Sequence, residues 1–102
     1  MQIRGREVDF KISRPKDAER MNMSLKHMDE VEKELKKETD IVAILTRFIK
    51  VLRDFFIEAT GADVLDDCDD AEEAKQTYLD FCHDINEQKS KILSVISPDD
   101  IK

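Results

Sequence analysis

The strongest apolar pattern in the chain extends from residue 39 to residue 64 and is typical of one long helix. The polar residues inside it recur at helical spacing and form one narrow stripe: Thr46, Arg47, Lys50, Arg53, Asp54 and Glu58. A helix that is apolar on its other sides must be covered from several directions. Thr39 or Asp40 can cap its start, and Gly61 supplies the left-handed residue that commonly ends a helix. The pattern predicts a central helix over residues 40–60.

Narrower amphipathic patterns flank the central helix on both sides. Apolar residues recur in steps of three or four along residues 14–37, which predicts a first helix with a slim, methionine-rich stripe. A similar stripe along residues 69–96 predicts a third helix, with Asp69 or Asp70 as its cap. Because the connection between the first two helices is short, they should lie antiparallel.

The first twelve residues alternate between apolar and polar. Val8, Phe10 and Ile12 fall on one face, which is the pattern of a half-buried strand. Gly5 interrupts the alternation and permits a small hairpin that turns at Gly5–Arg6. A hairpin of this size is marginal in water unless a helix or another subunit packs against it.

Together these patterns predict a mainly α fold. A short N-terminal β-hairpin, residues 1–12, should pack on a three-helix antiparallel bundle, and residues 1–102 should form a single domain. Composition agrees with this prediction. A chain of 102 residues suits one domain with one core. The presence of only two Gly and two Pro disfavours a fold made of strands and tight turns.

The net charge of −7 is distributed unevenly along the chain. Residues 1–60 hold 13 basic and 12 acidic side chains, a net charge of +1, whereas residues 61–102 hold 4 and 12, a net charge of −8. An acidic C-terminal half argues against nucleic acid as the main partner, because binding to phosphates requires clustered Lys and Arg. This charge favours solubility and a basic protein partner.

Neither a membrane span nor a signal peptide is recognisable. Arg47, Lys50 and Arg53 interrupt the longest apolar stretch, and the first ten residues carry charges where a signal peptide has its apolar core. We therefore expect a cytoplasmic protein without membrane contact. In that compartment Cys68 and Cys82 should be reduced thiols.

The acidic run over residues 66–70 raises the question of a cation site. A calcium loop counted from Asp66 would need Gly at its sixth position and Glu at its twelfth, where the chain has Ala71 and Thr77. Capping of the third helix explains these acids, and a weak surface site for a divalent cation is the alternative. No zinc-site spacing links the remaining metal-binding residues, which are His27, Cys68, Cys82 and His83. We expect no metal and no cofactor.

Catalytic motifs are also missing from the sequence. It has no GxSxG, no P-loop and no glycine-rich dinucleotide turn. A small magnesium-dependent helical hydrolase would hold its metal with paired acids on facing helices, but the ordered E-x-x-E and E-x-x-D pairs are absent. The acids that could have served are Glu30, Glu34, Glu73, Asp80, Asp84 and Glu87. We expect that the protein is not an enzyme.

Two features of the central helix are candidates for partner binding. The basic stripe of Arg47, Lys50 and Arg53 pairs with neighbouring acids or faces water, or else it docks an acidic partner or another copy of the chain. Phe55 and Phe56 point about 100° apart, so one flat surface cannot cover both. We expect one ring to fill the core and the other to cover the hairpin or an oligomer interface, with an uncovered strip beside them.

In its layout the chain resembles the small tail assembly chaperones of long-tailed phages and prophages of Gram-positive bacteria. In that family a short hairpin, here MQIRGREVDFKI, leads into a charged helix similar to PKDAERMNMSLKHMDEVEKELKK. An apolar helix follows and ends in an aromatic segment and a glycine, as in residues 55–61. An acidic turn and a last helix, here DDAEEAKQTYLDFCHDINEQ, complete the layout.

The resemblance implies a binding protein that coats the tape measure protein and keeps it soluble while the tail tube polymerises. Members of this family tend to self-associate. Such a chaperone needs adaptable apolar surface, and methionine-rich stripes provide it. The residues that qualify here are Met21, Met23, Leu25 and Met28.

Two other functions compete with the chaperone at this level. An acidic inhibitor module that binds a basic partner would depend on the acids of residues 66–70, and neutralising them would abolish binding while the fold survives. A magnesium-dependent hydrolase would instead bind a divalent cation through its helix-borne acids.

Overall fold

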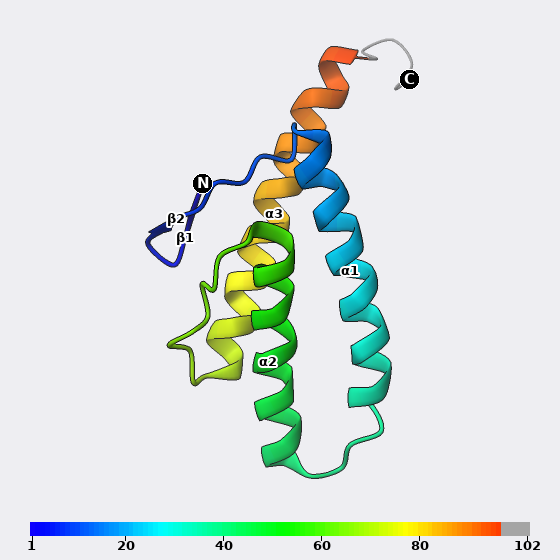
Figure 1. Cartoon of the computed structure of the whole chain (residues 1–102), viewed down its shortest axis with the longest axis vertical. Coiled ribbons are helices and arrows are strands. Elements are labelled where there is room, and N and C mark those ends of the chain that lie inside the picture. Colours follow the sequence, from blue (N-terminus) through cyan, green and yellow to red (C-terminus); the bar gives the residue numbers. More distant parts are fainter. Residues whose placement is uncertain (97–102) are drawn as a thin grey trace.

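A computed structural model describes residues 1–96 of the chain (Figure 1), so residues 97–102 of the predicted domain lie outside the described part. The elements are β1 (Gln2–Ile3), β2 (Arg6–Glu7), α1 (Pro15–Leu35), α2 (Ile41–Thr60) and α3 (Ala71–Ile96). The structure confirms the predicted mainly α fold class, with a short antiparallel hairpin packed against the helices.

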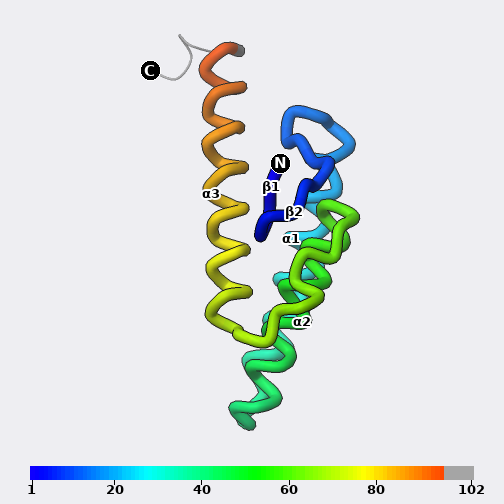
Figure 2. Tube along the Cα trace, turned by 90° about the vertical axis from the view of Figure 1, so that its left-hand side faces the viewer, coloured from blue at the N-terminus to red at the C-terminus, as the bar shows by residue number. Residues whose placement is uncertain are grey.

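The direction of α3 differs from the predicted antiparallel bundle. α1 and α2 are antiparallel, but the segment 61–70 returns along the molecule, and α3 then runs in the same direction as α2 (Figures 1 and 2). A ten-residue connection is long enough to make this return, whereas the short connection between α1 and α2 forces a reversal.

The hairpin is smaller than predicted and turns one residue earlier. Gln2 pairs with Glu7 and Ile3 pairs with Arg6, so the turn is formed by Arg4 and Gly5. Both turn residues have positive φ, at 53° and 77°, which matches the twist of a two-residue hairpin.

The chain continues in an extended form beyond β2 without further strand pairing. Val8 and Phe10 are buried, Ile12 is half-buried, and the residues between them are exposed. The alternation in this segment therefore reports burial against the helices and not a longer strand.

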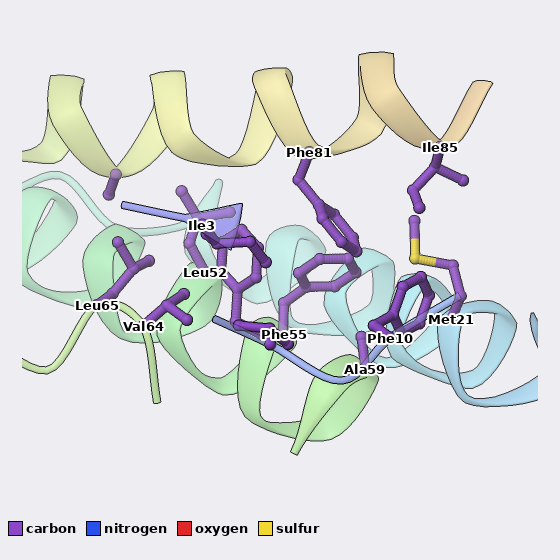
Figure 3. Close-up of a cluster of buried hydrophobic side chains, with 13 residues drawn as sticks. Ile3, Phe10, Met21, Leu52, Phe55, Ala59, Val64, Leu65, Phe81 and Ile85 are labelled. Atoms are coloured by element: carbon purple, nitrogen blue, oxygen red, sulfur yellow. The ribbon is translucent and has the colours of Figure 1, made fainter. Parts of the chain in front are cut away.

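Aromatic rings occupy the centre of the core, where the extended arm, α2 and α3 meet. Their centroids lie 5.1–6.0 Å apart with mostly edge-to-face geometry, and the rings belong to Phe10, Phe55, Phe56, Tyr78 and Phe81. Figure 3 shows Phe81 pointing from α3 toward Phe55, and Ile85 pointing toward Met21 of α1. Val64 and Leu65 of the return segment close the core from another side.

The predicted local signals set both ends of α2 and the start of α3. The Asp40 carboxylate accepts a hydrogen bond from the Ala43 amide at 3.0 Å, and Gly61 ends α2 with φ 78°. The Asp70 carboxylate accepts from the Glu72 amide at 2.8 Å, at the start of α3. These ends fix how far α2 and α3 extend past each other.

Candidate functional site

Phe55 and Phe56 are both buried, with 2% and 0% of their surface exposed. Both rings therefore fill the core, whereas we expected this of only one of them. The two rings do diverge, but α3 contacts both through Phe81, and the return segment and the N-terminal arm enclose the remaining sides. Phe56 offers no surface to a partner, and Phe55 contributes only to the lining of a groove between α1 and α2.

A groove between α1 and α2 is lined by four of the predicted partner-binding residues, one of which is the buried Phe55. It has a volume of about 450 Å³, and it brings Met28 of α1 together with Arg47 and Lys50 of α2. Its apolar lining includes Val31 and Val51. Met28 and Val51 are half-buried and Val31 is 44% exposed, so the groove presents apolar surface to solvent.

Charged side chains of both signs form the walls of this groove. Lys50 Nζ donates to Asp54 at 2.8 Å, and the Nδ1 atom of His27 lies 2.6 Å from the carboxylate of Glu58. Arg47, which also lines the groove, lies 3.5 Å from the carboxylate of Glu38. Because these pairs are exposed and weak, a ligand with its own charges can exchange for them at little cost.

Arg53, the third residue of the basic stripe, forms an ion pair with the return segment. Its guanidinium donates two hydrogen bonds to the carboxylate of Asp63, at 2.8 and 2.6 Å. This bidentate contact lowers the pKa of Asp63 and raises that of Arg53. Arg53 thus holds α2 to the return segment. This contact agrees with the expectation that the stripe pairs with neighbouring acids, and not with docking of a partner.

Met21 and Leu25 lie on the other side of α1, away from Arg47 and Lys50. Met21 is buried against the core and Leu25 is half-buried. Both line a second groove of about 530 Å³ between α1 and the later turns of α3, together with Ile92 and Leu93. The methionine stripe is therefore divided between two surfaces, and only Met28 faces the groove with the basic residues.

Arginine side chains of the hairpin form ion pairs with acids of the run over residues 66–70. Arg6 contacts the carboxylate of Asp66 at 2.6 Å and donates to the carbonyl oxygen of Asp63 at 2.6 Å. Arg4 contacts Asp67 at 3.3 Å. These contacts engage half of the acids that an inhibitor module would present to a basic partner, and they hold the hairpin on the return segment.

The acids that a magnesium-dependent hydrolase would need are dispersed. Glu73 lies 3.8 Å from Arg4, Asp80 accepts a hydrogen bond from Gln76, and Glu87 lies beside His83. Among residues 1–96, no three His, Cys, Asp or Glu side chains are grouped so that they could hold a metal ion.

Cys82 and Tyr78 are neighbouring, partly buried titratable groups on α3. Burial raises the pKa of the Cys82 thiol, and burial together with the neighbouring Cys82 raises the pKa of the Tyr78 hydroxyl. A thiol shifted in this direction is mostly protonated at neutral pH and is a poor nucleophile. The pair is consistent with packing, and it gives no sign of catalysis.

Sequence reasoning missed an exposed apolar surface at the beginning of α2. Ile41 and Val42 are 63% and 67% exposed, and Leu45 is 45% exposed. The apolar pattern did include these residues. The signal that could have found them is the length of the return segment, because it allows α3 to begin beside the middle of α2.

None of the helices in residues 1–96 has the length and apolar character required to cross a membrane. Comparison of the chain with protein-family models, with curated proteins and with solved structures gives no match.

Proposed function

We propose that this protein is a phage or prophage tail assembly chaperone that binds helical segments of the tape measure protein reversibly and keeps them soluble. The observation that supports this proposal most directly is the α1–α2 groove. It combines the apolar side chains of Met28, Val31 and Val51 with charged walls of both signs. The proposal also uses the resemblance in layout to that family.

The groove suits an amphipathic helix as its ligand. Residues 47–58 of α2 line it, and twelve helical residues extend over about 17 Å, or roughly three turns. An amphipathic helix would place its apolar face on Met28 and Val31 and its charges against the walls. The flexible thioether of Met28 adapts to different side chains, as a long client with many unequal segments requires.

The charge of the whole chain suits the same role. A net charge of −7 on a small protein keeps a complex with an aggregation-prone client in solution. We propose that binding is the whole activity, that it takes place in the bacterial cytoplasm without enzymatic chemistry, and that the protein self-associates as part of it. Nucleic acid is not part of the proposal, because the basic side chains of α2, which are Arg47, Lys50 and Arg53, lie beside carboxylates.

The test is co-expression with the tape measure protein encoded nearby, with the soluble fraction of the latter as the measurement. We expect the wild-type chain to raise this fraction severalfold. Val31→Glu places a charge in the groove and should abolish the gain. Met23→Glu is the matched control: Met23 is on the same helix and is also 44% exposed, but it lies outside the groove, so the gain should persist.

Two results would contradict parts of this proposal separately. If the wild-type chain leaves the solubility of the tape measure protein unchanged, the chaperone function is wrong. If Val31→Glu and Met23→Glu protect the client equally well, the function stands but the α1–α2 groove is not its site. Circular dichroism of both variants would verify that each keeps its helices.

A further inference from the structure

The charged side chains that line the α1–α2 groove follow one order along α2. Arg47 and Lys50 come first, and Asp54 and Glu58 follow in steps of four residues, so that all four lie on one side of the helix. Of the residues that α1 contributes to the same lining, only His27 can carry a charge. The α2 wall of the groove is therefore basic toward the start of the helix and acidic toward its end.

This order of charges opposes the stability of α2 itself. Acids near the N-terminus and bases near the C-terminus stabilise a helix, but α2 has no acid in its first turn and no base in its last, where Glu58 lies instead. Lys50 pairs with Asp54 at 2.8 Å, with the base before the acid, which is the less favourable order for this spacing. Departures from local preference are expected at functional sites.

These charges lie where a ligand in the groove can reach them. The side chains of Lys50 and Asp54 are 73% and 59% exposed, and that of Glu58 is 38% exposed. Beside them the apolar lining includes Met28 and Val51, both half-buried. A helix that packs on this apolar lining brings one of its flanks against the charged wall of α2.

The spacing along α2 defines the charges that such a ligand needs. Arg47 and Asp54 are seven residues apart, and Lys50 and Glu58 are eight apart, which corresponds to about 11 Å or two helical turns. A ligand helix that lies alongside would match this wall with one acid and one base about seven residues apart on the flank next to its apolar face.

We propose that the groove selects its ligand by the order of charges along it. The ligand is an amphipathic helix with an acidic side chain beside Arg47 and Lys50 and a basic side chain beside Asp54 and Glu58. The same helix with these two charges exchanged brings like charges together and binds more weakly. Turning it end for end does not restore the match, because its charged flank then faces α1. This inference rests on the proposed function, since it names the class of client segment that the groove accepts.

The test uses two synthetic peptides of about 18 residues, a length at which an isolated helix can form. Both carry the same apolar face of Leu and Ala, and one Glu and one Lys seven positions apart on one flank. They differ only in which of the two charges comes first. Calorimetry at about 50 mM salt should show that the wild type binds one peptide about fivefold more tightly than the other, and this ratio should approach one at about 1 M salt.

Exchanges of charge within the wall should change this preference in two steps. Lys50→Asp combined with Asp54→Lys mixes the signs along the wall, so the two peptides should bind equally. Adding Arg47→Glu and Glu58→Arg reverses the wall, and the preference should pass to the other peptide. Both variants keep the composition and net charge of the chain, and both place the acid before the base in the central pair, which favours the helix.

An ion pair of the same spacing outside the groove provides the matched control. Asp29 and Lys33 lie four residues apart on α1, 3.6 Å from each other, and neither lines the groove. Asp29→Lys combined with Lys33→Asp should keep the wild-type preference. Circular dichroism would verify that all variants keep their helices.

Failure of the wild type to bind either peptide, or equal affinity for both, would overturn the proposal. So would a preference that persists unchanged in the fourfold variant or at about 1 M salt, because charges would then not be its cause. None of these results bears on the chaperone function, which the solubility of the tape measure protein measures. A chain that leaves that protein insoluble but distinguishes the two peptides would contradict the chaperone function and support selection by charge.

Discussion

The two halves of α2 carry the same apolar pattern but are buried to different extents. Phe56 and Ala59, in the second half, are fully buried, whereas Ile41 and Leu45, in the first half, are exposed. α1 lies along both halves, but only the second half is also covered by α3, the return segment and the N-terminal arm (Figure 1). The difference teaches that the burial of a helix is decided by which neighbours overlap it, and not by its own pattern.

The largest loss of stability should come from truncating a side chain in the buried half of α2. Phe56→Ala removes a ring with no exposed surface that packs edge-on against Phe55 and Phe81. The free energy of unfolding should fall by about 3–5 kcal/mol, as lost burial and a residual cavity add together. Urea denaturation measures this change.

Leu45→Ala is the counterpart in the exposed half. It removes a side chain that is already 45% exposed, so the free energy of unfolding should fall by less than about 1 kcal/mol. Equal losses for Phe56→Ala and Leu45→Ala would mean that the two halves are covered to the same extent, and the comparison would fail.

An intermediate loss of stability is expected at the start of α2, where a local hydrogen bond stabilises the helix and neighbouring elements do not bury it. Asp40→Ala removes the carboxylate that accepts the Ala43 amide hydrogen bond at 3.0 Å. The free energy of unfolding should fall by about 1 kcal/mol. Asp40→Asn is the control, because an amide oxygen also accepts this hydrogen bond, and its cost should be a few tenths of a kcal/mol. If Asn costs as much as Ala, the charge and not the hydrogen bond holds the helix start.

Features set by neighbouring residues could be predicted from the sequence. The Asp40 cap and the left-handed Gly61 follow from local chemistry, and the helix bounds therefore came within two residues of the observed ones. The burial of Val8 and Phe10 followed from alternation. Each of these signals is contained in a few consecutive residues, so no knowledge of the remote chain was needed.

Features that depend on remote contacts were beyond the sequence pattern. The direction of α3 depends on how the return segment is held, and Arg6, which holds it through Asp63 and Asp66, is distant in sequence. The burial of both phenylalanines depends on the same segment. Of the predicted partner-binding residues, the groove brings together only those whose spacing on α1 and α2 places them along the same contact line, namely Met28, Arg47, Lys50 and Phe55.

The smallest effect should come from the ion pair that borders the buried half. Arg53 holds the pKa of Asp63 below its ordinary value of 3.8, so Asp63 binds a proton less readily in the folded protein than in the unfolded chain. The pair therefore stabilises the fold above that ordinary value, and this contribution is lost as the pH falls through the lowered pKa. Asp63→Asn should lower Tm by about 2–4 °C at pH 7, because the pair is partly exposed and screened by solvent. The difference from the wild type should shrink to nothing in the most acidic buffers.

Thermal unfolding at successive pH values measures this difference, and Asp54→Asn is its control. Asp54 pairs with Lys50 within one helix, in the less favourable order of charges, so its loss should change Tm by about 1 °C or less. If Asp63→Asn lowers Tm by the same amount in strong acid as at pH 7, the substitution disturbs the packing of the return segment. The ion pair would then not be the reason why the second half of α2 stays covered.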